Sequence, residues 1–167
     1  LRAAKKAKQL NMPIMCITNK EYSSIWEISD YKVDCHAGEE KSIAATKSFT
    51  AQMLCVYLLT LKFAQIHGAD ITDKLNIVRT LPKVVEETFD FRKKVVQLAK
   101  LLKRKKNIVI TADGISYALA KEASLKIKET SYLNVNANIL GEFMHGHVAV
   151  LNNSCSLIYI SATGVSY

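Results

Sequence analysis

The stretch 107-NIVITADGISYALAKEASLKIKETSYL-133 decides the fold, because an apolar run passes through a short turn into a long helical pattern. Residues 107–111 have the length and the β-branched apolar content of a strand buried on both faces. Asp113-Gly114 form the turn, and residues 115–133 show helical spacing of apolar side chains. This order predicts one strand–helix unit of a parallel sheet.

The same alternation of strands and helices extends outward from this unit. Further strands are predicted at 13–18, 31–35 and 156–160. Further helical segments are predicted at 1–10, around Ile25-Trp26, at 42–66 and at 75–106. The run 13–18 is continuous and is also expected to be buried on both faces. Strands separated by helices of this length predict an α/β fold with a parallel sheet.

Composition narrows the class of protein. The 167 residues are 49% hydrophobic and 23% charged, which is typical of a globular chain. No continuous apolar run approaches the roughly 20 residues that cross a bilayer, and the first residues lack the pattern of a signal peptide. We therefore expect a cytoplasmic protein without a membrane partner.

The four cysteines form no CxxC pair, which excludes zinc ribbons. Three of them, Cys16, Cys55 and Cys155, lie in apolar stretches that are typical of reduced, packed thiols.

The net charge of +8 would suit nucleic acid, a membrane surface or a phosphorylated small molecule. Much of the excess lies in the clusters 5–8, 92–94 and 103–106, each on or at the end of a predicted helix. Basic residues are usual there, because they face solvent or complement the helix dipole. No zinc finger, aromatic RNA-binding motif or basic zipper is present. We expect no nucleic-acid partner.

Three charged residues share one face of the predicted helix 115–133. Glu122, Lys126 and Glu129 are spaced i, i+4 and i+7, which places them within about 60° of one another around the helix axis. On spacing alone they fit a solvated row of salt bridges. They also fit a carboxylate whose pKa is tuned by a lysine so that it can move a proton.

Two other segments carry candidate ligand-binding residues. His145 and His147 flank Gly146, a spacing that fits a metal site poorly and leaves a turn or a ligand contact open. Residues 37–48 follow a predicted strand and open a predicted helix, whose free N–H groups could bind an anionic or hydroxyl-rich ligand. The alternative is an ordinary cap, in which Ser42 or Glu40 pairs with those N–H groups.

Three segments together resemble the sugar isomerase (SIS) domain family. Residues 37–52, AGEEKSIAATKSFTAQ, resemble the family segment AG-E-VASTKAFT-Q. Residues 122–132, EASLKIKETSY, resemble E-ALKLKE-SY, and residues 141–146, GEFMHG, resemble GE-KHG. The segments occur in the family's order and at compatible spacing. The resemblance is closest to the isomerase half of glucosamine-6-phosphate synthase and to SIS-type amino-sugar-phosphate deaminases.

The resemblance implies a three-layer αβα sandwich with a parallel sheet in each of two lobes that pack together and dimerise. By this likeness, residues 1–72 are the later part of a first lobe and residues 107–167 the earlier part of a second. Residues 73–106 would be the connecting helical segment. The expected assembly is a homodimer.

The resemblance also implies an activity. Family members interconvert a ketose 6-phosphate and an aldose or amino-aldose 6-phosphate, some as aminotransferases and some as deaminases. By motif match Glu129 is the base that moves a proton between C1 and C2, His145 assists sugar ring opening, and Lys126 lies near the sugar oxygens. Ile43, Ala45, Thr46 and Glu122 are the matched substrate-binding positions. No metal or organic cofactor is expected, and a non-catalytic sugar-phosphate sensor remains the alternative.

Overall fold

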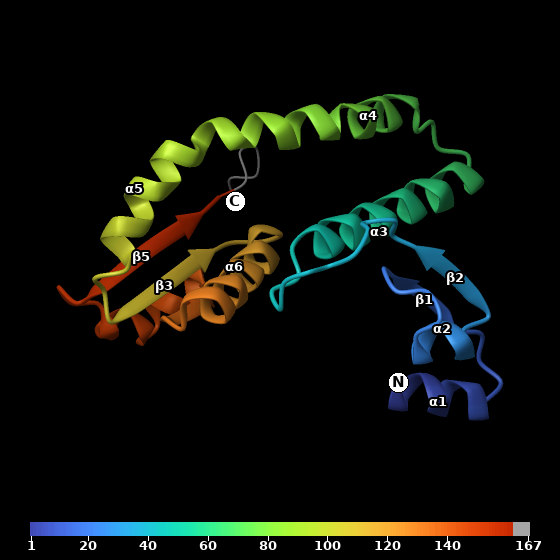
Figure 1. The fold of residues 1–167 in the computed structure, drawn as a ribbon, viewed down its shortest axis with the longest axis horizontal. Coiled ribbons are helices and arrows are strands. Elements are labelled where there is room, and N and C mark those ends of the chain that lie inside the picture. The colour runs from blue at the N-terminus through green and yellow to red at the C-terminus, as the bar shows by residue number, and fades with distance from the viewer. Residues whose placement is uncertain (162–167) are drawn as a thin grey trace. The chain divides into compact units, whose positions relative to one another are not determined.

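The computed structural model describes residues 1–161 and divides the chain into two compact units, Leu1–Pro82 and Lys83 onward. The boundary lies inside the predicted connecting segment, and each unit is described here by itself (Figure 1). The last six residues of the predicted part-lobe 107–167 lie outside the described residues. The assignment of the two ends of the chain to two lobes stays a prediction.

The first unit contains a two-stranded parallel sheet with helices before, between and after its strands. Its elements are α1 (Arg2–Gln9), β1 (Met15–Thr18), α2 (Ser24–Ile28), β2 (Tyr31–Asp34), α3 (Lys47–Ile66) and most of α4 (Thr72–Glu87). Strand β1 pairs with β2 in parallel, with Met15 opposite Tyr31. Asp30 fixes the start of the pair, because its carboxylate accepts the Ile14 N–H at 2.9 Å and pairs with Lys8.

Two expectations for this unit are wrong in detail. The strand predicted at 13–18 begins at Met15, whose side chain is exposed, so β1 is not buried on both faces. The helix predicted from Ser42 begins at Lys47. Residues 41–46 are irregular because the carboxylate of Glu40 accepts the N–H of Ser48 at 3.1 Å and so satisfies a donor at the helix start.

Helix α3 also corrects the expectation that no apolar segment is long enough to cross a membrane. It has 20 residues, and by length and composition alone it could span a bilayer. Only Ser48 and Leu61 of this helix are buried within the chain. The core helix of a soluble protein passes the same test, so this finding is weak evidence for a membrane.

The second unit contains a three-stranded parallel sheet in the order β4-β3-β5. Its elements are the end of α4, η1 (Thr88–Phe91), α5 (Arg92–Leu102), β3 (Asn107–Ala112), α6 (Ser116–Ser131), β4 (Asn134–Ile139), α7 (Leu140–Met144), η2 (His147–Val150) and β5 (Cys155–Ile160). The helical segment predicted at 75–106 is observed as α4, η1 and α5, with a 3₁₀ break at η1 and an end at Leu102. The sequence TFDF of η1 consists of weak helix formers, which explains the break.

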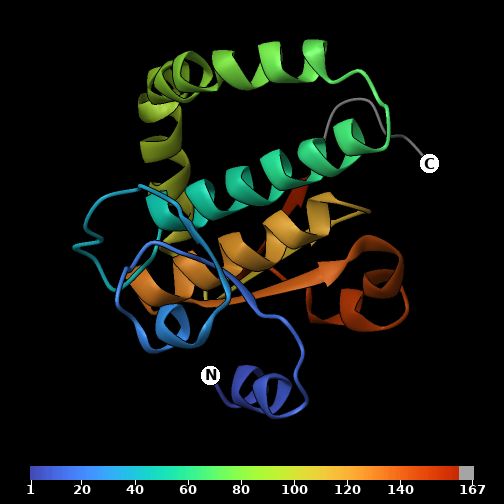
Figure 2. The same ribbon diagram turned by 90° about the vertical axis from the view of Figure 1, so that its right-hand side faces the viewer.

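The core of this unit lies between the sheet and α6, which runs along it (Figure 2). Ile108, Ile110 and Ala112 of β3 are almost fully buried, together with Ala120 of α6 and Val135 of β4. Ser124 ties the helix to the sheet, because its hydroxyl donates a hydrogen bond to the Val135 carbonyl at 3.0 Å. The predicted strand–helix unit is confirmed.

Strand β4 is missing from the sequence prediction. Its sequence NVNANI alternates asparagines with apolar residues, and asparagine is depleted in strands. The strand forms because Val135 enters the core and the backbone pairs with β3 over its whole length. With the parallel sheets of both units, the chain has an α/β fold consistent with a three-layer sandwich.

Candidate functional site

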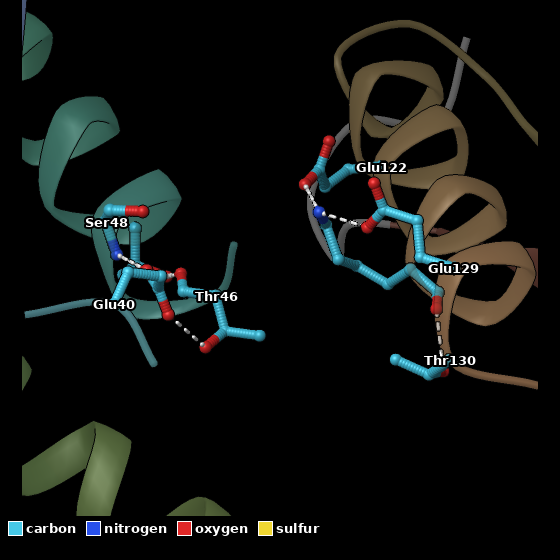
Figure 3. A network of polar contacts seen from close by, with 8 residues as sticks. Glu40, Thr46, Ser48, Glu122, Glu129 and Thr130 are labelled. Atoms are coloured by element: carbon cyan, nitrogen blue, oxygen red, sulfur yellow. Dashed lines mark hydrogen bonds and ion pairs between the residues drawn. The ribbon is translucent and has the colours of Figure 1, made fainter. Parts of the chain in front are cut away.

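The charged face predicted on α6 forms a cluster centred on Lys126. The Lys126 ammonium lies 2.8 Å from an oxygen of Glu129 and 3.3 Å from an oxygen of Glu122 (Figure 3). The side chains of Lys126 and Glu122 are each 23% exposed and that of Glu129 is 28% exposed, so the cluster is partly shielded from water. One ammonium thus holds two carboxylates on the same helix face.

The two carboxylates determine the charge state of the lysine. The hydrogen bond to Glu129 is the largest cause, and with Glu122 it raises the pKa of Lys126 above its usual 10.5. Lys126 therefore stays positively charged at neutral pH. A fixed ammonium next to a carboxylate is suited to chemistry in which a proton leaves carbon and negative charge develops on a neighbouring oxygen.

His145 lies at the end of a short helix held by one buried side chain. Phe143 of α7 is 1% exposed, and α7 contacts both β4 and β3. The N–H of His145 donates to the Glu142 carbonyl at 3.1 Å, and Gly146 follows with a φ of +121°, which favours glycine. The His145 side chain itself is exposed. Within residues 1–161 it makes no hydrogen bond or ion pair with Glu122, Lys126 or Glu129.

The segment 37–48 of the first unit is shaped by a side chain that the sequence analysis does not identify. Asn19, just after β1, donates from its amide nitrogen to the Gly38 carbonyl at 2.7 Å. Its amide oxygen accepts the Ala37 N–H at 2.8 Å. These two bonds hold the turn at Gly38, whose φ of +70° favours glycine. The position of Asn19 directly after a predicted strand was the feature of the sequence that could have indicated this role, because polar residues there often fix the following loop.

Glu40 crosses this segment and reaches the start of α3 (Figure 3). One carboxylate oxygen accepts the Ser48 N–H at 3.1 Å, and the other accepts the Thr46 hydroxyl at 3.5 Å. The pKa of Glu40 is lowered below its usual 4.5. The largest causes are hydrogen bonds from the Ser48 side chain and backbone, and Thr46 and the charge of Lys47 act in the same direction. The capping alternative for this helix end is therefore observed, with Glu40 rather than Ser42 as the cap.

The other predicted positions differ in accessibility. The Ile43 side chain is 96% exposed, Thr46 is exposed, and Ala45 is half-buried beside the buried Ala44. The roles of Ile43, Ala45 and Thr46 as substrate-binding positions stay predictions. In the part of the chain that is described, no three His, Cys, Asp or Glu side chains are grouped as a metal ion would require.

Comparison with known proteins identifies the family. The model of the SIS domain matches residues 1–62 and 101–167. The chain belongs to the SIS domain family. These two matched stretches include all three motifs that resemble the family, and they contain the strands of both sheets.

Relatives and solved structures agree with the SIS assignment. The chain is 35% identical over 153 residues to glutamine–fructose-6-phosphate aminotransferase (isomerizing) from Cyanidium caldarium, covering 89% of this chain and 25% of the relative. It resembles the structure of the C-terminal domain of glucosamine-fructose-6-phosphate aminotransferase from Francisella tularensis, with a TM-score of 0.88 and 26% identity, over 94% of this chain and 45% of that one. Glucosamine-6-phosphate deaminase from Thermotoga maritima gives a TM-score of 0.75 and 25% identity, over 97% and 47% of the two chains. The chain thus spans about a quarter of its curated relatives and about half of these solved chains.

Proposed function

We propose that this chain is the part of a phosphosugar aldose–ketose isomerase that carries the proton-transfer residues. The substrate would be a ketose 6-phosphate or an amino-aldose 6-phosphate, the class named by the aminotransferase and deaminase relatives. The observation that carries the proposal is the Glu122–Lys126–Glu129 cluster, because a binding module needs no carboxylate paired with a fixed ammonium. We further propose a soluble protein, in which the apolar side of α3 packs against protein.

The proposed reaction moves one proton between neighbouring carbons and a second proton between the heteroatoms that those carbons bear. Glu129 takes a proton from the carbon next to the carbonyl or imine, and returns it to the adjacent carbon. Lys126 stabilises the negative charge on the enediol oxygen while the proton is on Glu129. Glu122 positions Lys126, since its carboxylate lies 3.3 Å from the ammonium. His145 assists opening of the sugar ring, and its exposed side chain is accessible to a ligand or to a second subunit.

The backbone around Ile43 and Ala45, together with Thr46, would bind sugar hydroxyls. This fits the irregular, exposed run before α3, whose own first N–H groups are partly satisfied by Glu40. The expected assembly is a homodimer in the cytoplasm.

The variant Glu129→Gln tests the assignment of the base in the full-length protein. It keeps the shape of the side chain and one oxygen that can accept from Lys126, but it cannot take a proton from carbon, so we expect proton exchange to fall by about 10²–10⁴-fold. Glu86→Gln, on an exposed position of α4, is the matched control and should exchange at the wild-type rate. Exchange is measured by NMR in D2O, and sugar-phosphate binding by calorimetry.

Retained binding with lost exchange in Glu129→Gln supports the proposal. Unchanged exchange in this variant would show that another group is the base. Binding of sugar phosphates without any exchange in the wild-type protein would instead support a non-catalytic sensor.

A further inference from the structure

Two cysteines that are twenty positions apart in the sequence meet in the first unit. Cys35 directly follows β2, and Cys55 lies on α3. Both line a pocket of about 510 Å³ whose other walls include Val33, Leu54 and Leu58. Within this shared lining, the Cys55 thiol is close enough to raise the pKa of the Cys35 thiol. Both cysteines are partly exposed, so a small molecule in solution has access to this pair.

The backbone holds Cys35 in place for this contact. Its N–H donates to the Thr18 carbonyl at 3.0 Å, which extends the pairing of β2 with β1 by one residue. Cys55 is fixed by its position in the middle of a 20-residue helix. Neither thiol therefore depends on a mobile end to reach the other.

The remaining cysteines lie elsewhere and cannot replace either partner without rearrangement. Cys16 is buried on β1, and Cys155 is buried on β5 in the other unit. The Cys155 thiol donates to the Val150 carbonyl at 3.1 Å. Among the four cysteines, Cys35 and Cys55 are the pair that is partly exposed and in mutual contact.

The surroundings make Cys35 the less reactive of the two thiols. Burial, the neighbouring Cys55 and then the charge of Asp34 raise the pKa of the Cys35 thiol to about 11. A thiol reacts with oxidants as its thiolate, so Cys35 is a poor first nucleophile at neutral pH. Cys55 is then the sulfur that reacts first, and Cys35 the sulfur that resolves the product.

We propose that Cys35 and Cys55 form an oxidation site, at which a peroxide converts the thiol pair into a disulfide between the end of β2 and α3. In the first step the Cys55 thiol releases its proton, the thiolate attacks a peroxide oxygen, and the O–O bond breaks. The hydroxide that leaves takes up the released proton, so the products are a sulfenic acid and water. In the second step the Cys35 sulfur attacks the Cys55 sulfur, the S–S bond forms, the S–O bond breaks, and water leaves with the Cys35 proton. Two thiols lose two electrons and two protons, and hydrogen peroxide is reduced to two waters.

The position of the disulfide gives it a consequence for ligand binding. The bond would close a ring that contains residues 36–54, and this ring includes the whole segment 37–48 with Glu40 and the turn at Gly38. A cross-link over this length removes conformational freedom from the enclosed segment. The chemical step is independent of the proposed function, whereas any effect on sugar-phosphate affinity rests on it.

The full chain, treated with a tenfold excess of hydrogen peroxide and then alkylated, tests the proposal. We expect a mass loss of about 2 Da before alkylation, because two hydrogens leave as the disulfide forms. When the treated chain is denatured before alkylation, two of its four cysteines should take up the reagent. Trypsin cleaves after lysine, so the tryptic peptides 33–41 and 48–62 should be found joined, and a reductant should separate them.

Three comparisons make the result specific. The double variant Cys16→Ser/Cys155→Ser should form the same link at the wild-type rate. Cys35→Ser should instead accumulate a sulfenic acid on Cys55, which dimedone traps. The link should form about tenfold faster or more in the native chain than in guanidinium, because only folding brings the two thiols together. Four free thiols after treatment, a link between other cysteines, or an equal rate in the denatured chain would each overturn the proposal.

Discussion

Replacing Phe143 with alanine tests how the structure holds the segment that carries His145. Phe143 is 1% exposed and is the one buried residue of α7, a helix that contacts β4 and β3 of the sheet as well as η2. Removing a fully buried phenylalanine side chain costs about 3–5 kcal/mol of stability. That is a large share of the roughly 5–15 kcal/mol by which a domain is stable.

The assay is urea unfolding of the variant, monitored by circular dichroism. We expect the midpoint to fall while the slope stays close to the wild-type value, since the amount of surface exposed on unfolding changes little. Met144→Ala is the matched control, because Met144 is the next residue of the same helix and is 62% exposed. Its effect should stay within about 0.5 kcal/mol. A loss below about 1 kcal/mol for Phe143→Ala would refute the inference that this side chain anchors α7.

Three further variants test charges and the candidate ring-opening residue. The folded-state pKa of Lys126 is raised, so the stability that its charge contributes is present below pH 10.5 and is lost as the pH rises through the folded-state pKa. The variant Lys126→Met should remove this alkaline loss of stability, which thermal melts across pH 9–12 measure. The folded-state pKa of Glu40 is lowered, so its contribution to stability is present above pH 4.5 and is lost as the pH falls through the folded-state pKa. The variant Glu40→Gln should therefore lose less stability between neutral and acidic pH than the wild type. The same loss in both proteins would contradict the capping role. In the full-length protein, His145→Ala should slow turnover of cyclic sugar phosphates by about 10²–10⁴-fold while sparing open-chain analogues, and equal losses on both would remove the ring-opening role.

Local patterns predicted the elements that are stabilised by their own residues. The run 107–111 has the composition of a central strand, and the structure buries it at the middle of a sheet. Helical periodicity likewise placed Glu122, Lys126 and Glu129 on one face, because this depends only on the geometry of a helix.

Features that depend on distant partners were missed or misplaced. The edge strand β4 has asparagines at alternate positions, and its pairing with β3 rather than its composition makes it a strand. The start of α3 shifted to Lys47 because Glu40 bonds to a backbone group eight residues away. The contact between Cys35 and Cys55 joins two elements, and no pattern within either element indicates it.

The most direct test of the proposed reaction is NMR of the full-length wild-type protein with glucosamine 6-phosphate in D2O. If Glu129 moves a proton between C1 and C2, deuterium must enter at C2, because the proton on the carboxylate exchanges with solvent. We predict deuterium at C2, accompanied by free ammonia if the protein is of the deaminating kind. Demonstrated binding of glucosamine 6-phosphate and of other phosphosugars without deuterium uptake from any of them would contradict the account.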